Sequence, residues 1–365
     1  SRRKAKNSMD HFQIKNGILH AEDVPLTRIA DEVGTPVYVY SRATLERHAQ
    51  VFREGIAPVG RSHIAFAIKA NPNRAVLRVL AKQGYGADVV SGGEISRAIS
   101  AGMKPEDVVF SGVGKTRAEL EQALDVGIGQ FNIELEEEGV VLAQIAASKG
   151  KTAVATLRVN PDVDAGTHAK ISTGKKENKF GVAIDLAPGI FDRLANLPGL
   201  SMQGVALHIG SQLFDLDPLE AAYGRIGQLV GDLRGMGHKI ERVDLGGGLG
   251  VPYKADENPP SPADYGQMVA RATKGWDVTL MFEPGRVIVG NAGVLLTKVI
   301  WIKPGVIRPY VIVDAAMNDL ARPAMYDAWH DFAAVQPTGE RMNANIAGPV
   351  CESGDTFAMG RDIDA

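Results

Sequence analysis

Eight short apolar runs recur between residues 62 and 285, and a polar or glycine-containing turn follows each of them. The runs cover residues 64–68, 87–90, 108–110, 129–133, 153–159, 204–209, 242–245 and 278–282. Most intervals between them have the spacing of an amphipathic helix, as at 74–82, 94–101, 117–126, 134–148 and 219–234. Because strands that alternate with helices form parallel sheets, the pattern predicts an α/β fold with a closed (β/α)8 TIM-type barrel. An open, doubly wound sheet is the alternative.

The two ends of the chain carry a different pattern. β-Branched runs at 294–302 and 310–313 are not followed by a strong helical period. Near the front, residues 12–19 contain Asn16-Gly17, the usual signal of a tight hairpin. We therefore expect a second, mostly β domain that is built from both ends of the chain.

These patterns suggest limits for the parts of the chain. The expected limits are 9–40 and 286–365 for the β domain, 41–285 for the barrel, and 1–8 (SRRKAKNS) for a remnant of an expression vector.

Composition narrows the class of protein. Hydrophobic residues make up 45% of the 365 residues and charged residues 23%, as in a soluble globular protein. A net charge of -3 gives no reason to expect nucleic acid or a membrane surface as a partner, and no apolar run approaches the roughly 20 residues that span a bilayer. The single cysteine, Cys351, excludes an internal disulfide framework and is typical of the cytoplasm.

Polar residues and glycines gather where the predicted strands end, which is where barrel enzymes place their catalytic groups. In chain order these ends carry Lys69, Asp88, Ser111, Asn132, Arg158 with Asn160, His208, Gly246 with Gly247 and Gly248, and Glu283 with Gly285 and Arg286. A lone lysine at such a point is ordinarily a solvated rim residue. Within this set, Lys69 of FAIKAN (66–71) becomes a candidate for amine chemistry such as a Schiff base.

Two glycine-containing loops follow the last two predicted barrel strands. DLGGGLG (244–250) offers backbone amides to an anion, although it is also compatible with an ordinary tight turn. EPGR (283–286) comes after the next strand, and barrels often bind phosphate between the loops after strands seven and eight. The pair therefore predicts a phosphate site.

Glu283 stands next to this predicted phosphate site. Closure of the barrel makes the eighth and first strands neighbours, so Glu283 and Lys69 should lie on adjacent strands. A carboxylate beside a pyridine nitrogen keeps that nitrogen protonated, whereas a salt bridge with a rim arginine is the alternative. His208 has no second ligand at metal spacing, and we expect a flat ring against a cofactor or an ordinary core histidine.

Seven motifs in order make the chain resemble the diaminopimelate decarboxylase family, which belongs to the barrel class of pyridoxal phosphate enzymes with alanine racemase and ornithine decarboxylase. The motifs are FAIKAN, ADVVSGGE (87–94), HIGSQ (208–212), DLGGGLG, EPGR, DAAMNDLARPAMY (314–326) and GPVCES (348–353). The resemblance implies decarboxylation of meso-2,6-diaminopimelate to L-lysine, the last step of lysine biosynthesis, with pyridoxal 5'-phosphate as cofactor and no metal. It also implies a homodimer with shared active sites.

The resemblance assigns a role to each motif residue. Lys69 would carry the cofactor, His208 would stack on its ring and Glu283 would pair with the ring nitrogen. The implied cofactor-binding residues are Lys69, Asp88, Arg158, His208, Ser211, Gly246, Gly247, Gly248, Glu283, Gly285 and Arg286. The implied substrate-binding residues are Arg286, Arg322, Tyr326 and Glu352, and the implied catalytic residues are Lys69, His208, Glu283 and Cys351.

In this family Cys351 and Glu352 would come from the partner subunit, and Cys351 is the candidate acid that protonates Cα. A lone cysteine is otherwise a small buried hydrophobe. Arg286 and Arg322 suit a bidentate clamp on a carboxylate, although a surface ion pair is the ordinary reading of Arg322. The family also has a glycine-alanine-tyrosine segment whose tyrosine contacts the phosphate, and this segment is expected beyond Ala365.

Two other functions remain open at this point. The first is decarboxylation of ornithine, lysine or arginine, against which Arg322 argues because a cationic substrate tail would not tolerate a guanidinium. The second is a non-catalytic pyridoxal phosphate-binding homologue, which would have no need of Arg322, Tyr326, Cys351 and Glu352.

Overall fold

The computed structural model describes residues 10–164 and 178–364, and the chain divides into two compact units. The barrel unit comprises Leu45–Val251 and Asn258–Val289. The β unit takes the rest of the chain, from both ends and from residues 252–257. The expected vector remnant at 1–8 lies outside the described residues.

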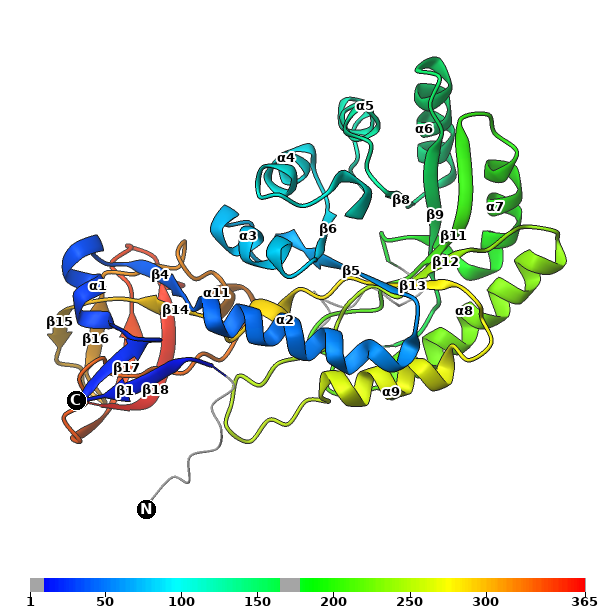
Figure 1. The fold of residues 1–365 in the computed structure, drawn as a ribbon. Coiled ribbons are helices and arrows are strands. Elements are labelled where there is room, and N and C mark those ends of the chain that lie inside the picture. Colours follow the sequence, from blue (N-terminus) through cyan, green and yellow to red (C-terminus); the bar gives the residue numbers. More distant parts are fainter. Residues whose placement is uncertain (1–9, 165–177, 365) are drawn as a thin grey trace. The chain divides into compact units, whose positions relative to one another are not determined.

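Eight parallel strands form the closed barrel predicted from the sequence (Figure 1). They are β5 (Ser62–Ala67), β6 (Gly86–Val89), β7 (Val108–Phe110), β8 (Gln130–Ile133), β9 (Ala153–Asn160), β11 (Leu200–Ala206), β12 (Arg242–Asp244) and β13 (Thr279–Phe282). Pairing of β8 with β9 completes the ring, so the alternative of an open sheet is wrong. A two-residue strand, β10 (Val182–Ala183), adds to β9 outside the ring.

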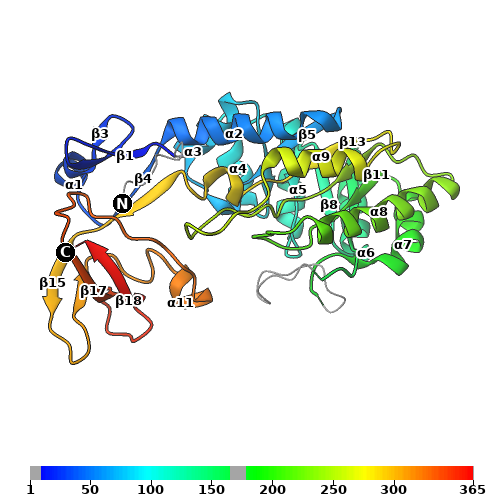
Figure 2. The same ribbon diagram turned by 90° about the horizontal axis from the view of Figure 1, so that it is seen from below.

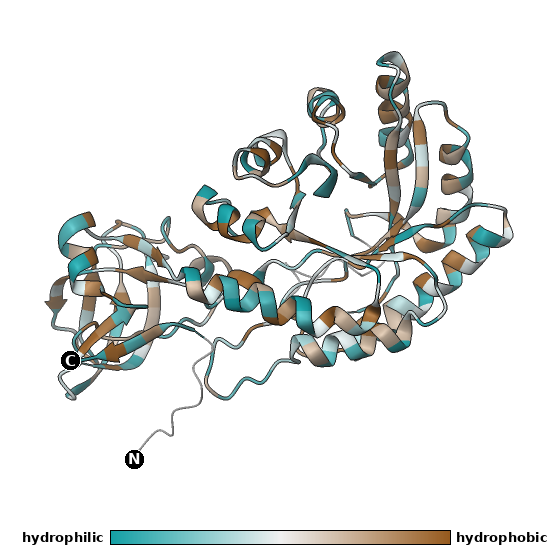
Figure 3. Cartoon of the chain, viewed as in Figure 1, coloured by the Kyte–Doolittle hydropathy of each residue, from teal (hydrophilic) through white to brown (hydrophobic). Residues whose placement is uncertain are grey.

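The strands are apolar because both of their faces are covered, by the barrel interior and by the surrounding helices. All four residues of β6 and of β8 are buried, as are the last six residues of β9. The helices around them are α2 (Arg42–Ile56), α3 (Arg74–Lys82), α4 (Gly92–Ser100), α5 (Arg117–Val126), α6 (Glu136–Ser148), α7 (Ala187–Ala195), α8 (Asp217–Gly235) and α9 (Pro262–Ala272), with the short α10 (Arg286–Val289). Figure 3 shows brown, apolar residues along β9 and alternating brown and teal turns along α2.

Helices α2 and α9 lie side by side on the barrel (Figure 2). A Cβ on Gly266 would stand 1.9 Å from the backbone oxygen of Gly55, and one on Gly55 would stand 2.5 Å from the backbone of Pro262. The close approach of these two helices therefore depends on glycine at both positions.

Side-chain caps begin several barrel helices directly after the strand exits. Ser91 caps α4 by accepting from the Glu94 amide, and Thr116 forms a capping box with Glu119 at the start of α5. Because these caps fix where each helix starts, they keep the loops at the carboxyl ends of the strands short. The residues at the strand exits are thereby held on a rigid scaffold.

The β unit is built from both chain ends, as the sequence predicted. Its elements are β1 (Phe12–Lys15), β2 (Ile18–Ala21), β3 (Val24–Pro25), α1 (Leu26–Val33), β4 (Val37–Tyr40), β14 (Gly293–Leu296), β15 (Val299–Lys303), β16 (Tyr310–Val313), α11 (Arg322–Tyr326), β17 (Arg341–Ala347) and β18 (Thr356–Asp364). Asn16 and Gly17 have φ of 52° and 80°, so the predicted hairpin turn between β1 and β2 is confirmed.

The prediction that residues 294–302 form one continuous run is wrong. They form two strands, because β14 pairs with β4 whereas β15 pairs with β16. Strands β15 to β18 form a four-stranded sheet in sequence order, in which only β16 and β17 are parallel.

None of the helices within residues 10–164 and 178–364 combines the length and apolar character that crossing a membrane requires.

Candidate active site

Lys69 leaves the barrel at the end of β5, in a single 3-10 turn (Ile68–Ala70). Ala67 and Ile68 before it are buried, whereas Lys69 itself is exposed. Strand β13 pairs in parallel with β5, and the Ala67 amide donates to the carbonyl of Pro284 at 3.0 Å. This bond joins the Lys69 turn to the segment that carries Glu283, so the two predicted neighbours do lie on adjacent strands.

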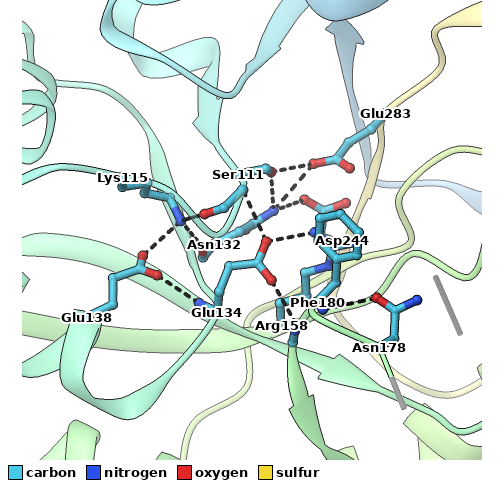
Figure 4. Close-up of polar contacts among 12 residues, drawn as sticks. Ser111, Lys115, Asn132, Glu134, Glu138, Arg158, Asn178, Phe180, Asp244 and Glu283 are labelled. Atoms are coloured by element: carbon cyan, nitrogen blue, oxygen red, sulfur yellow. Dashed lines mark hydrogen bonds and ion pairs between the residues drawn. The ribbon is translucent and has the colours of Figure 1, made fainter. Parts of the chain in front are cut away.

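Glu283 belongs to a layer of polar side chains inside the mouth of the barrel (Figure 4). Its Oε1 accepts from Ser111 Oγ and from Asn132 Nδ2, both at 3.3 Å. Asn132 Nδ2 also donates to Asp244 Oδ2 at 3.1 Å. Three strand ends, at β7, β8 and β12, therefore meet the carboxylate that follows β13.

The carboxyls of this layer are buried close together. Burial raises the pKa of Glu283 well above its ordinary value, and the negative charges of Asp244 and Asp88 raise it further, while Lys69 acts in the opposite direction. Burial also raises the pKa of Asp88 to about 6, against the effect of Lys69. Asp88 Oδ1 has no hydrogen-bond partner within the part of the chain that the structure describes. The site therefore holds more carboxyl groups than its one nearby lysine can neutralise.

The glycine loops leave no room for side chains. A Cβ on Gly247 would stand 2.2 Å from the carbonyl oxygen of Glu283, and one on Gly246 would stand 2.5 Å from that of Leu207. A Cβ on Gly285 would contact the Cβ atoms of Ala67 and Ala70 at 3.2 Å. Gly248 has a φ of +128°, a conformation that glycine alone adopts readily. Glycine at these positions therefore lets the loops after the last two barrel strands pack tightly against neighbouring segments of the chain.

His208, Ser211 and Arg286 border these loops. His208 Nδ1 accepts from the Gly247 amide at 3.3 Å, and burial, together with the positive charges of Lys69 and Arg158, holds the pKa of His208 well below its ordinary value. Its ring is therefore neutral near pH 7. Arg286 Nη2 donates to Ser211 Oγ at 3.5 Å, which brings a guanidinium to the edge of the glycine loops.

Arg158 is held in place by a buried carboxylate. Its Nη1 donates to Glu134 Oε1 at 2.7 Å, and its guanidinium lies 4.8 Å from the ring centre of Phe180. Glu134 also accepts from the amides of Gly112 and Gly181, at 3.1 and 2.8 Å. Because Glu134 is saturated with donors, it fixes the direction of Arg158.

A second buried ion pair supports the same loops. Lys115 Nζ donates to Glu138 Oε1 at 2.8 Å and to the carbonyls of Gly112 and Asn132, at 2.7 and 2.8 Å. Its side chain is 0% exposed. Lys115 has a structural task in these bonds, unlike the exposed Lys69.

The arrangement suits the pyridoxal phosphate expected from the sequence. It combines an exposed amine, a glycine cradle with an adjoining guanidinium, and an excess of buried carboxyls that favours a cationic ring nitrogen. The orphaned Asp88 Oδ1 is a further acceptor without a donor among the described residues. A cavity of about 1100 Å³ lies at the opposite end of the barrel, where the strands begin, and takes no part in this set.

Three of the expected substrate residues, Arg322, Tyr326 and Glu352, belong to the β unit, whereas Arg286 belongs to the barrel unit. Arg322 begins α11, with its guanidinium 4.4 Å from the ring centre of Tyr253 and its Nη1 3.1 Å from His330 Nε2. Tyr326 ends the same helix and is half-buried. Together they form the polar side of a short helix that follows the DAAMND loop.

Cys351 and Glu352 lie in the turn before β18, and both are exposed. The reading of Cys351 as a small buried hydrophobe is therefore wrong for this chain. Buried Asp355 accepts from the amides of Val350 and Met317, at 2.7 and 2.6 Å, which ties this turn to the loop preceding Arg322. The structure thus brings the two substrate motifs of the β unit together, and it does the same separately for the cofactor motifs of the barrel unit.

The sequence reading missed several residues of the site. Gln130, Thr156, Glu134 and Asp244 were not singled out, although Gln130 and Asn132 stand two apart on β8 and so face the same side. Polar residues at alternate positions of an otherwise apolar strand were the available signal. Lys115 and Glu138 carried no signal of this kind.

Comparison with known proteins identifies relatives over nearly the whole chain. A match to the family described as "Pyridoxal-dependent decarboxylase, pyridoxal binding domain" covers residues 42–290. Diaminopimelate decarboxylase of Zymomonas mobilis is 54% identical over 357 residues, which are 97% of this chain and 85% of that protein.

Solved structures agree with these relatives. Diaminopimelate decarboxylase from M. jannaschii in complex with L-lysine has a TM-score of 0.93 at 36% identity, covering 98% of this chain and 85% of that one. The Helicobacter pylori enzyme, also with L-lysine, has a TM-score of 0.89 at 40% identity and covers 92% and 84%.

Proposed function

This chain belongs to the diaminopimelate decarboxylase family of pyridoxal-dependent decarboxylases, and from that premise we propose how its own residues perform the reaction. It is a carboxy-lyase that converts meso-2,6-diaminopimelate to L-lysine and CO2 in lysine biosynthesis, with pyridoxal 5'-phosphate as cofactor. The observation that carries the proposed roles is the placement of Lys69 and Glu283 on adjacent strands beside the glycine loops.

The barrel residues bind and orient the cofactor. When bound, pyridoxal phosphate acts as an electron sink for the bond that releases CO2. Lys69 Nζ is the covalent attachment point, and Glu283 holds a proton at the ring nitrogen. His208, which is neutral, would contact the ring, because a cationic imidazolium there would oppose a protonated ring nitrogen.

The glycine loops, Ser211 and Arg286 would hold the phosphate of the cofactor. Gly246, Gly247 and Gly248 form the loop beside it, and the amide of Gly248 would donate to it, because those of Gly246 and Gly247 already donate to Asp244 Oδ1 and His208 Nδ1. Gly285 lets the chain pass Ala67, and Arg286 with Ser211 supplies a charged and a neutral donor. Asp88 and Arg158 complete the cofactor-binding set from the neighbouring strand exits.

Residues of the β unit would bind the substrate. Arg322 would bind the distal carboxylate, and Tyr326 would add a hydroxyl donor. Glu352 binds the distal amine, since the amide of Gly354 and the hydroxyl of Ser353 lower the pKa of its carboxyl and keep it ionised.

The exposed thiol of Cys351 returns the proton to Cα after CO2 has left. We place Cys351 and Glu352 in the site of the partner subunit of a homodimer. The cytoplasm remains our prediction for the compartment.

Arg322→Ala tests the choice of substrate. Loss of charge-assisted bonds of about 1.5–3 kcal/mol should raise KM for meso-diaminopimelate by roughly 10–100-fold. Binding of the product L-lysine should weaken by a similar factor, because CO2 leaves from Cα and lysine keeps the distal carboxylate. Steady-state release of CO2 and inhibition by lysine measure the two effects. Arg341→Ala, which removes an exposed arginine of the same unit paired with Asp364, serves as the control.

The same assay distinguishes decarboxylation of meso-diaminopimelate from the two alternative functions. Wild-type enzyme should release CO2 from meso-diaminopimelate and not from ornithine, lysine or arginine. Turnover of ornithine that improves in Arg322→Ala would contradict the proposed substrate. Absence of turnover on all four substrates, despite bound cofactor, would favour a non-catalytic homologue.

Mixing two inactive variants tests the shared site. If Cys351 serves the partner's Lys69, a heterodimer of Lys69→Ala and Cys351→Ala has one doubly altered site and one intact site. Equal mixing should then restore about a quarter of the sites. Mixing Lys69→Ala with Glu283→Gln is the control, because both changes lie on the barrel and each heterodimer site keeps one defect. Heterodimers that form without rescue would overturn the shared site.

A further inference from the structure

Asp244 is the last residue of β12 and is 1% exposed. Its Oδ1 accepts from the Gly246 amide at 3.0 Å. Its Oδ2 accepts from Gln130 Nε2 at 3.2 Å and from Asn132 Nδ2 at 3.1 Å. These donors are neutral amides, so they hold the carboxylate in place without neutralising it.

Asn132 connects Asp244 to Glu283 in a fixed orientation. Its Oδ1 accepts from Thr156 Oγ1 at 2.6 Å and from Gln130 Nε2 at 2.7 Å. The amide nitrogen must therefore point toward acceptors, which are Ser111 Oγ at 3.0 Å, Asp244 Oδ2 at 3.1 Å and Glu283 Oε1 at 3.3 Å. One amide nitrogen thus donates to both carboxyls (Figure 4).

The charges around Glu283 are unbalanced. Asp244 and Asp88 face it from β12 and β6, and Lys69 faces it from the turn after β5. Around Asp244 itself, Arg242 lies on the same strand, and the hydroxyls of Tyr223 and Tyr265 lie 2.9 Å apart on α8 and α9. Two buried carboxylates sharing one amide repel each other, so the pair is stabilised when it holds one proton or faces a second cation.

We propose that Asp244 is a positioning residue for the cofactor: through Asn132, it makes Glu283 hold a proton in the cofactor-free enzyme, and Glu283 passes that proton to the ring nitrogen on binding. The O–H bond of Glu283 breaks and an N–H bond forms, so no proton has to come from solvent for this step. The site then discriminates in favour of rings with a basic nitrogen. This inference rests on the cofactor site of the proposed function and adds a role for a residue outside the expected set.

The number of protons taken up when the cofactor binds distinguishes an electrostatic role of Asp244 from a purely structural one. Asp244→Asn removes one negative charge, so Glu283 should lose its proton in the cofactor-free enzyme. Binding must then take up about one more proton per site than in the wild type, and affinity should fall about tenfold more per unit rise in pH near neutrality. Thr156→Val removes a bond to Asn132 of the same array but no charge, and it should keep the wild-type proton count.

The probe is pyridoxine 5'-phosphate, which has the ring nitrogen and the phosphate but no aldehyde. Without covalent attachment to Lys69, its Kd is an equilibrium quantity. Titration calorimetry in two buffers with different ionisation enthalpies counts the protons for the wild type, Asp244→Asn and Thr156→Val. The free probe titrates alike in all three experiments, so differences between the proteins belong to the site.

Equal counts in the wild type and Asp244→Asn would overturn the proposal, as would a shift in Thr156→Val as large as that in Asp244→Asn. Should Asp244→Asn fail to fold, the infrared difference spectrum of wild-type enzyme with and without the probe decides. A protonated-carboxyl band must disappear on binding and be missing from Glu283→Gln, and a spectrum without that loss rejects the proposal. Failure of the wild type to bind the probe or pyridoxal phosphate would instead count against the cofactor site itself.

Discussion

Lys69→Ala is expected to abolish covalent attachment of pyridoxal phosphate and to lower the rate of diaminopimelate decarboxylation by at least about 10²–10⁴-fold, the range for a single positioned acid–base group. Attachment through Lys69 Nζ prepares the cofactor for exchange with the substrate amine, and no other described lysine lies at this strand exit. Mass spectrometry after borohydride reduction, together with the initial rate of CO2 release, measures both losses.

The fold should survive this change because Lys69 is exposed and lies at the end of a strand rather than within it. Circular dichroism and the thermal midpoint check this point. Lys82→Ala, which removes an exposed lysine from the end of α3, should leave attachment and rate unchanged. A reduced cofactor adduct elsewhere in the same barrel of Lys69→Ala, with activity retained, would show that the attachment point is wrong.

Glu283→Gln has the second-largest expected effect, a fall in kcat of roughly 10²–10³-fold, as for the loss of one electrostatic partner. Glutamine keeps the shape and can still accept from Ser111 Oγ and Asn132 Nδ2 through its carbonyl oxygen. It cannot carry the negative charge that stabilises a protonated ring nitrogen. The variant therefore separates charge from packing.

Single-turnover rates and the absorption spectrum of the bound cofactor report this effect directly. Glu241→Gln provides the matched control, since Glu241 is exposed and pairs with Lys239 at the surface. Equal turnover in Glu283→Gln and the wild type would remove Glu283 from the chemistry, even if the cofactor still binds.

The position of the strands was largely readable from the sequence. The predicted run at 108–110 coincides with β7, and those at 153–159 and 278–282 differ from β9 and β13 by one residue at one end. Such runs stand out because parallel barrel strands are apolar on both faces. Asn16-Gly17 was equally informative, since its positive φ angles suit very few residue types.

The residues at the strand exits could also be predicted from the sequence, because parallel strands place all of their carboxyl ends at the same end of the barrel. That rule alone placed Lys69 and Glu283 on neighbouring strands. The rule could not show which buried polar side chains lie below Lys69 and Glu283. The split of 294–302 into β14 and β15 escaped for a related reason, because a β-branched run does not reveal which partner each half will pair with.

By itself, the sequence determined the barrel, the β unit and the order of polar residues at the strand ends, all of which depend on local period and turn chemistry. Only the tertiary structure decided that Asn132 lies between Asp244 and Glu283, 112 and 151 residues away in the chain. Such contacts follow from barrel closure and strand register, which bring side chains from four strands to one level. The proton balance of the site depends on that packing, because burial and the distance between like charges exist only in the folded chain.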